Sequence, residues 1–298
     1  MRICIVTDEI SADPETAVEL GAQWGIRDFE LRGYYYDRVP SITDHQKLRL
    51  KEVIRQYDAR VVAISPGLFK FPLPPTEPES IPLPWLDRVC YDAWEYSKKQ
   101  TEEHLNELLP ATIDFAHEMG AKTIVSFAFS RDGYPAGLAP EPLLEYLFRA
   151  AEKVKAAGLQ LAIENEFGFW ADTGERTAEI VKRVGHPNLG INWDPGNAYC
   201  AGDTPFPDGY LSVKDRILHV HFKDVRRVPN GGCEFVEFGE IDWSGQLKAL
   251  AEDGYQGYIS IETHLRPKIA AAKSALDRLK AMIPPVEGSA GKYEWNTT

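Results

Sequence analysis

The sequence lacks the features that mark membrane, secreted and disulfide-rich proteins. No apolar run approaches the roughly 18 consecutive residues of a membrane helix, and the first eight residues are too short and too soon acidic for a signal peptide. The cysteines form no CxxC pair, which argues against structural zinc or a disulfide framework and favours free thiols at Cys4, Cys90, Cys200 and Cys233. We therefore expect a cytoplasmic protein with no membrane partner.

Positive charge is also scarce. The chain has 33 Lys and Arg against 45 Asp and Glu, which gives a formal net charge of -12 and a pI near 5.1. Such a surface repels polyanions, so we expect no nucleic-acid partner. No GxGxxG follows the first expected strand, so the usual sign of dinucleotide binding is missing.

What the 298 residues do contain is a regular alternation of strand and helix patterns. We expect helices at 15–24, 41–57, 101–119, 141–157, 175–184, 243–253 and 267–282, with a short one after 209. We expect strands at 2–8, 28–31, 60–65, 122–129, 159–164, 189–194, 217–224 and 258–263. This alternation predicts a parallel sheet, and eight units fit an α/β fold of the closed (β/α)₈ TIM-barrel type.

Residues 1–283 are expected to form this single barrel domain, with one unusual segment. Seven prolines between 66 and 84 remove amide donors and predict a stiff, extended loop in place of helix or sheet. We interpret about 66–99 as a lid or interface segment, with a plain insertion as the alternative. The Gly-rich, polar tail at 284–298 is expected on the surface or against a partner subunit.

Four potential metal ligands stand at the ends of the last four strands: Glu164, Asp194, His221 and Glu262. The carboxyl ends of barrel strands form the active site in this fold, and side-chain alternation points all four inward. Three converging carboxylates would repel one another and raise each other's pKa unless a cation neutralised them. Three oxygen ligands with one imidazole favour Mn²⁺, with Mg²⁺, Co²⁺ and Zn²⁺ as alternatives.

Neighbouring polar and aromatic residues allow two interpretations each. His219 shares the inward face and is more typical of a bonded interior histidine than of a ligand. Glu166 and His264 lie one step farther out, either supporting the ligands or on the rim. Asn197, in Asp-Pro-Gly-Asn, contacts metal or substrate or belongs to an ordinary turn. Trp170 walls a substrate pocket or packs in the core.

The motifs that carry these residues resemble those of the sugar phosphate isomerase/epimerase family of xylose isomerase-like TIM barrels. They are Leu-Ala-Ile-Glu164-Asn, Asn-Trp-Asp194-Pro-Gly-Asn197, His219-Val-His221-Phe-Lys-Asp224, and Ile241-Asp242-Trp243 followed by Gly254-Tyr255-Gln-Gly257 and Ile261-Glu262. The resemblance covers about 1–283 and is strongest over 159–264. Before that stretch it is limited to Phe29-Glu30-Leu31.

The resemblance implies that Glu164, Asp194, His221 and Glu262 bind one divalent ion, with Glu164 and Glu262 doubling as acid and base. It adds Glu30, Trp170, Asn197 and Arg227 as candidate substrate contacts. Ketose epimerases of the family carry a His at the position of Asn197, and Phe-Gly239-Glu240 replaces a common Gly-Glu-Gly. These departures place epimerase-type substrate contacts in doubt.

The chemistry implied is proton abstraction beside a metal-bound carbonyl, through an enediolate. The leading hypothesis is an isomerase or epimerase of a sugar or polyol ketone. A dehydratase acting on inosose or dehydroshikimate is the alternative, and an endonuclease IV-type nuclease or an inactive binding protein is less favoured. The absence of a Gly-rich anion loop favours an unphosphorylated polyol as the small-molecule substrate. The oligomeric state stays open, a homo-oligomer included.

Overall fold

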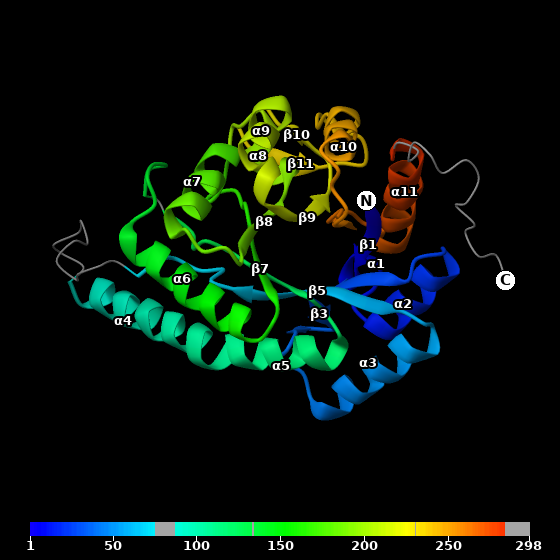
Figure 1. The fold of residues 1–298 in the computed structure, drawn as a ribbon, viewed down its shortest axis with the longest axis horizontal. Helices are drawn as coiled ribbons and strands as arrows, with labels where there is room; N and C mark the ends of the chain where they lie inside the picture. The colour runs from blue at the N-terminus through cyan, green and yellow to red at the C-terminus, as the bar shows by residue number, and fades with distance from the viewer. Residues whose placement is uncertain (75–86, 133, 230, 284–298) are drawn as a thin grey trace.

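The computed structural model describes residues 1–74, 87–132, 134–229 and 231–283, with the backbone alone for 87–94. Eight parallel strands close into one barrel (Figure 1). Around the barrel the order is β1 (Arg2–Val6), β12 (Tyr258–Ile261), β9 (Ile217–Phe222), β8 (Leu189–Trp193), β7 (Gln160–Glu164), β6 (Thr123–Ser126), β5 (Arg60–Leu68) and β2 (Asp28–Leu31). This confirms the predicted (β/α)₈ TIM barrel and its eight strands.

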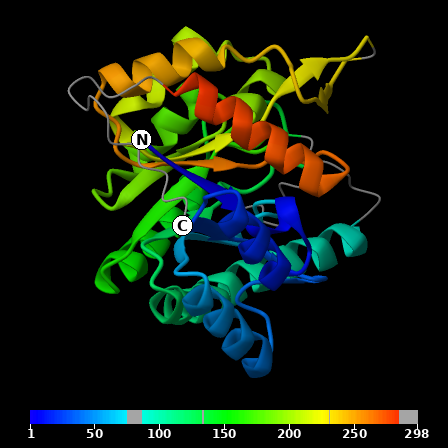
Figure 2. The ribbon, with the colours of Figure 1, turned by 90° about the vertical axis from the view of Figure 1, so that its right-hand side faces the viewer.

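Helices surround the strands, as Figures 1 and 2 show. They are α2 (Pro14–Gln23), α3 (Asp44–Gln56), α4 (Asp87–Glu103), α5 (Leu109–Met119), α6 (Glu141–Ala156), α7 (Gly174–Val184), α10 (Trp243–Glu252) and α11 (Lys268–Met282), with a π-helical turn (His104–Leu108) joining α4 to α5. The expected start signal of α2 is present, because the Asp13 side chain accepts from the Glu15 amide at 3.2 Å and Pro14 is the first helical residue.

Three local expectations were wrong. Strand β5 continues through Pro66 to Leu68 across a register shift, where a missing amide donor is tolerated. Helix α4 begins at Asp87, well before the expected start at 101. The residues after Asp194 form helix α8 (Pro195–Cys200), not a turn, because the Asp194 carboxylate caps the Asn197 amide at 2.8 Å. Residues 75–86 of the predicted lid and the predicted tail lie outside the described residues.

Short elements extend the strands at their carboxyl ends. Helix α1 (Thr7–Ile10) follows β1, and the hairpin of β3 (Gly33–Tyr34) and β4 (Asp37–Arg38) follows β2. The hairpin of β10 (Val225–Arg227) and β11 (Cys233–Phe235) follows β9 and projects from the body in Figure 2. A π-helical turn (Pro205–Gly209), α9 (Tyr210–Val213) and a 3₁₀ turn (Lys214–Arg216) link α8 to β9. Helix α1, helix α8 and the two hairpins therefore border the mouth of the barrel, and the Lys214–Arg216 turn leads back to the amino end of β9.

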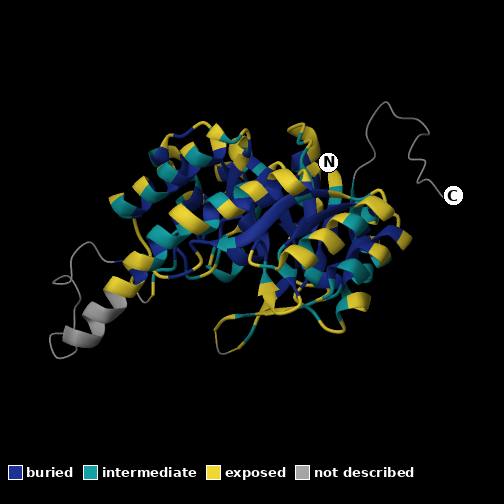
Figure 3. Ribbon diagram, turned by 90° about the horizontal axis from the view of Figure 1, so that it is seen from below, coloured by how far each residue is buried: buried dark blue, intermediate teal, exposed yellow. Residues whose placement is uncertain are grey.

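The strands are the most buried part of the molecule, and exposed residues lie on the outer faces of the helices (Figure 3). Apolar strand residues pack against the helices. Toward the carboxyl ends the interior turns polar, and Glu30, Asn192, His219, His221 and Ser260 are all at most 1% exposed. Buried polar groups need partners, so this end of the barrel is where chemistry is concentrated. No helix in the described ranges is long and apolar enough to cross a membrane.

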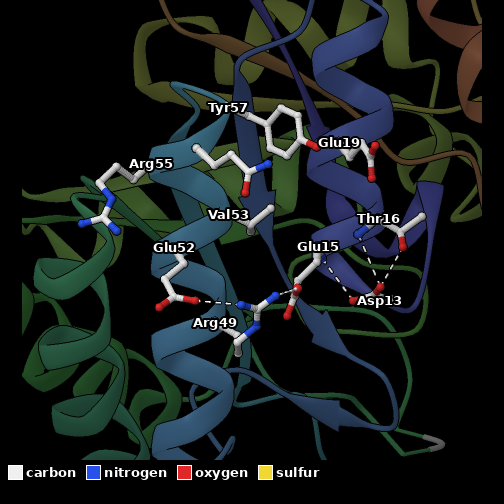
Figure 4. Close-up of a pocket in the computed structure, with 10 residues that line it drawn as sticks. Asp13, Glu15, Thr16, Glu19, Arg49, Glu52, Val53, Arg55 and Tyr57 are labelled. Atoms are coloured by element: carbon white, nitrogen blue, oxygen red, sulfur yellow. Dashed lines mark hydrogen bonds and ion pairs between the residues drawn. The ribbon is translucent and has the colours of Figure 1, made fainter.

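An outer groove between α2 and α3 shows the contrasting situation (Figure 4). Arg49 on α3 bridges Glu15 of α2 at 2.8 Å and Glu52 of its own helix at 2.8 Å. The charges in this groove therefore satisfy each other at the surface. Such exposed pairs contribute only about 0–1 kcal/mol each, and here the Arg49–Glu15 pair joins the two helices that form the groove.

Candidate metal centre and active site

Four side chains from adjacent strands meet at one point inside the mouth. Ligand atoms of Glu164, Asp194, His221 and Glu262 all lie within 4.8 Å of one another, and all four residues are buried. His221 Nδ1 is 3.3 Å from Glu164 Oε1, 3.2 Å from Glu262 Oε2 and 3.9 Å from Asp194 Oδ2. The structure thus brings together the four residues that alternation placed inward.

Strand register explains this convergence. Glu164 pairs with Asn192 across β7 and β8, so Asn192 and, two residues on, Asp194 face the same interior. Asp194 is the first residue beyond β8 and is fixed by Asn165, whose side chain donates to Asp194 O at 2.7 Å and accepts from Asp194 N at 2.8 Å. The carboxylate position is therefore set by both strand and side-chain amide.

The imidazole of His221 is oriented from behind by Glu30. His221 Nε2 lies 3.2 Å from Glu30 Oε2, which also lies 2.9 Å from His219 Nε2. Burial raises the pKa of Glu30, but the charges and hydrogen bonds of the two imidazoles outweigh it and hold that pKa well below its ordinary value. With its side chain fully buried, Glu30 supports the histidines and does not line open space as a substrate contact would.

Lys223 is the main residue that sequence reasoning missed. Its Nζ lies 2.7 Å from Asp194 Oδ2 and 3.0 Å from Glu262 Oε2, and the side chain is buried. Burial lowers the pKa of Lys223, but the surrounding carboxylates, Asp194 first, raise it well above its ordinary value. A signal was available, because the alternation that directs His219 and His221 inward continues to position 223.

The three carboxyl groups differ in pKa. Burial above all, then the repulsion of the other two carboxylates, raises the pKa of Asp194 to about 6 although Lys223 opposes this. At Glu262, burial is outweighed by Lys223 and His221, which hold the pKa well below its ordinary value. Burial at Glu164 is outweighed by His221, so its pKa is also lowered. All three groups thus have a pKa below 7 and are mainly carboxylates at neutral pH, as a proton acceptor must be.

The donor set fits a divalent cation. Asp194 Oδ2 is buried and, among the described residues, makes no hydrogen bond of acceptable geometry, although the Lys223 ammonium is close. Three carboxylate oxygens and one imidazole nitrogen that converge in a buried site form a donor set that a divalent ion would neutralise. Burial lowers the pKa of His221, but Glu164, Glu30 and Glu262 raise it well above its ordinary value. Because Glu30 lies at Nε2, His221 would bind a cation through Nδ1 once that nitrogen loses its proton.

A second network flanks the site on the β1 and β2 side. Arg32 lies 2.9 Å from Asp8 Oδ2 and 2.6 Å from Glu9 Oε1, and it also contacts Glu262. His264 bridges Glu9 at 3.3 Å and Glu262 at 3.4 Å. Despite burial, the His264 hydrogen bond and Arg32 hold the pKa of Glu9 at about 2. Despite burial, Glu262 and Glu9 raise the pKa of His264 to about 9.

The remaining predicted residues lie at increasing distance from the centre. Asn197 Nδ2 is 3.4 Å from Glu164 Oε1, so this residue borders the ligands. Glu166 binds Lys70 at 2.7 Å on the rim. Arg227 is exposed on β10, where its guanidinium lies 4.7 Å from the Tyr199 ring centroid. Trp170 lines a cavity beside α7 whose other residues include Leu138 and Arg176, apart from the four ligands.

A family assignment follows from the sequence comparison. The model of the xylose isomerase-like TIM barrel family matches residues 18–282. The chain belongs to this family. An inosose dehydratase of Lacticaseibacillus casei is 26% identical over 186 residues, 52% of this chain and 61% of that protein. The rhizopine catabolism protein MocC of Rhizobium meliloti is 26% identical over 249 residues, 72% of this chain and 74% of that protein. The first relative is thus matched over less than two thirds of its length.

Solved structures share the fold. An IOLI protein with a bound zinc atom superposes with a TM-score of 0.71 at 20% identity, covering 95% of this chain and 98% of that one. The probable 3-DHS dehydratase AsbF from Bacillus anthracis gives 0.66 at 17%, covering 94% and 99%. A D-allulose 3-epimerase from Methylomonas sp. gives 0.66 at 14%, covering 95% and 97%. At these identities the likeness concerns the fold alone.

Proposed function

We propose that this protein is a divalent-metal-dependent dehydratase that removes water from a polyhydroxylated ketone. The observation that carries the proposal is the position of Lys223, a buried ammonium 3.0 Å from the Glu262 carboxylate at the meeting point of the four candidate ligands. Elimination needs a base for the carbon-bound proton and an acid for the leaving hydroxyl. The site contains both within one small volume.

The residues divide this work as follows. Glu164 or Glu262, both carboxylates at neutral pH, takes the proton from the carbon next to the ketone. The released electron pair forms the carbon–carbon double bond, and the β carbon–oxygen bond breaks. Lys223 donates a proton to the departing hydroxyl, which leaves as water. A divalent ion held by the four ligands would polarise the ketone as a Lewis acid; Mn²⁺ is our first choice for their oxygen-rich set.

Relatives support dehydration over the isomerase or epimerase reaction that the motifs first suggested. The curated relatives include inosose dehydratases, and Asn197 replaces the histidine of the ketose epimerases. Epimerisation remains a second candidate on one observation. Glu164 and Glu262 both approach His221 Nδ1, at 3.3 and 3.2 Å, so two carboxylates are available to remove a proton and return it from another side.

The test is a substrate panel in deuterated water with Mn²⁺. Purified protein is incubated with inososes, 3-dehydroshikimate and ketoses, and products are followed by mass spectrometry and NMR. Dehydration gives a product lighter by one water, whereas epimerisation replaces one carbon-bound hydrogen by deuterium and raises the mass by about one unit. EDTA-treated protein and Glu262→Gln are the controls. A protein that binds no divalent ion, or that exchanges no carbon-bound proton with any substrate, would refute the proposal.

A further inference from the structure

The mouth of the barrel contains a second arginine that is not neutralised. Arg38 ends β4, and its Nε donates to the carbonyl of Ser65 at 2.8 Å. Its two Nη groups contact no acceptor among the described residues. Arg32, by contrast, contacts three carboxylates. The same residue type is therefore fully paired at one position and only backbone-bonded at the other.

The charge of Arg38 nevertheless interacts with those of the candidate catalytic groups. Burial and then the neighbouring Arg32 lower the pKa of Arg38, while the carboxylates of Glu164, Asp8 and Glu262 act in the opposite direction. The guanidinium touches none of these carboxylates. Its place beside the mouth follows from geometry, because Ser65, whose carbonyl it binds, lies on β5. Its Nη groups are therefore available to an anionic group that enters the mouth.

A cavity is available for that anion. Arg38 lines a space of about 460 Å³ together with Ser41, Gly67, Lys70 and His104. Lys70 adds a second positive charge, which pairs with Glu166 at 2.7 Å. Gly67 leaves room for the guanidinium, because a β-carbon there would lie 3.1 Å from Arg38 Nε and 3.3 Å from its Cζ. The chain therefore places Arg38, whose Nη groups have no acceptor among the described residues, at the edge of this cavity.

We propose that Arg38 binds an anionic oxygen group of the substrate, a carboxylate or a phosphate, so that the substrate is a ketone acid and not a neutral polyol. The guanidinium fork matches two such oxygens at once. This inference rests on the proposed function, which places the reacting end of the substrate at Glu164 and Glu262. The inference itself concerns the opposite end of the substrate, which Arg38 binds while the carbon–hydrogen bond is broken.

Matched substrates and variants test this inference. The Mn²⁺-loaded full chain is assayed with the neutral inososes and with 3-dehydroshikimate, which carries one carboxylate. Arg38→Met removes the fork, Arg38→Lys keeps only a point charge, and Arg49→Lys in the outer groove is the control. We expect Arg38→Met to raise KM for the acid by roughly 10- to 100-fold, the size of a lost charge-assisted hydrogen bond, with kcat within about threefold. The KM of Arg38→Lys for the acid should lie between those of the wild type and Arg38→Met.

Binding without turnover separates the inference from the proposed function. Calorimetric titrations with shikimate and with inorganic phosphate report the anion site alone and distinguish a carboxylate from a phosphate. Binding of either anion that Arg38→Met abolishes, with metal content and melting temperature unchanged, supports the inference even if no panel substrate turns over. Failure of wild type to bind either anion, equal binding by Arg38→Met, or equal KM effects on neutral and acidic substrates would overturn it.

Discussion

The two halves of the barrel mouth are built differently. On β7, β8, β9 and β12 the chemical groups stand on the strands or one residue beyond them, and they are acidic apart from His221 and Lys223. On the β1, β2 and β5 side, Glu30 stands on its strand and Arg32 one residue beyond it, but Asp8, Glu9 and Arg38 stand on α1 and the β3–β4 hairpin. One half gathers the candidate cation ligands, and the other contains two arginines, of which Arg38 is the proposed anion contact. A substrate with a ketone at one end and an acid at the other would span both.

Removing a ligand from the acidic half should have the largest effect. Glu262→Gln takes away one of three charged oxygen ligands and a candidate base, so we expect activity to fall about 10³-fold or more. Metal content, measured by plasma mass spectrometry after dialysis, should fall with it. Glu52→Gln, on the outer face of α3, is the control for loss of one carboxylate. Unchanged metal content in Glu262→Gln would contradict the proposal that Glu262 is a metal ligand.

Lys223 tests whether the acidic half contains a separate proton donor. In Lys223→Met the leaving hydroxyl loses its acid, and we expect dehydration to slow by about 10²-fold. Deuterium exchange at the neighbouring carbon should slow less, because the base remains. Metal affinity should not fall, since the ammonium competes with the ion for Asp194 and Glu262. Loss of metal in this variant would instead make Lys223 a structural support of the ligands.

The two halves also differ in what the sequence could reveal. Alternation along a strand fixes side-chain direction, so Glu164, Asp194, His221 and Glu262 were predicted to converge, and they do. The same rule extends to Lys223, where it was not applied. Arg38 is different, since its position depends on a two-stranded hairpin and on a contact with the Ser65 carbonyl.

Backbone detail was likewise only partly predictable. Asp194 is the N-cap of helix α8 and Pro195 its first residue. The sequence Asp-Pro-Gly-Asn is equally typical of a turn, so helix α8 was not predicted. The eight strands were predicted because each is an apolar run of the right length between turn residues. Contacts across loops have no such periodic signal, and they account for most of what could not be foreseen.

The contribution of Glu9 to the unfolding free energy should depend on pH more strongly than that of an exposed acid. The Glu9 pKa of about 2, against an ordinary 4.5, means that folding gains stability fully present above pH 4.5 and lost as pH falls through 2. At pH 7 this amounts to about 3 kcal/mol. The unfolding free energy of Glu9→Gln should therefore lie below wild type at pH 7, with the gap closing toward pH 2. Urea unfolding at three pH values measures it, with exposed Asp44→Asn as control. A gap that widens in acid would contradict the assignment.

Gly67 offers the smallest and most selective way to disturb the arginine half. Gly67 and Gly120 both have positive φ, +81° and +76°, so alanine at either should cost about 1 kcal/mol of stability through backbone strain. Only at Gly67 does the added β-carbon meet Arg38; at Gly120 nothing lies within 4 Å. We therefore expect Gly67→Ala alone to raise KM for an acidic substrate, by up to about tenfold, with kcat and metal content unchanged. Equal kinetics for the two variants would mean that the position of Arg38 does not matter for substrate binding, and the distinction between the two halves would then be one of structure only.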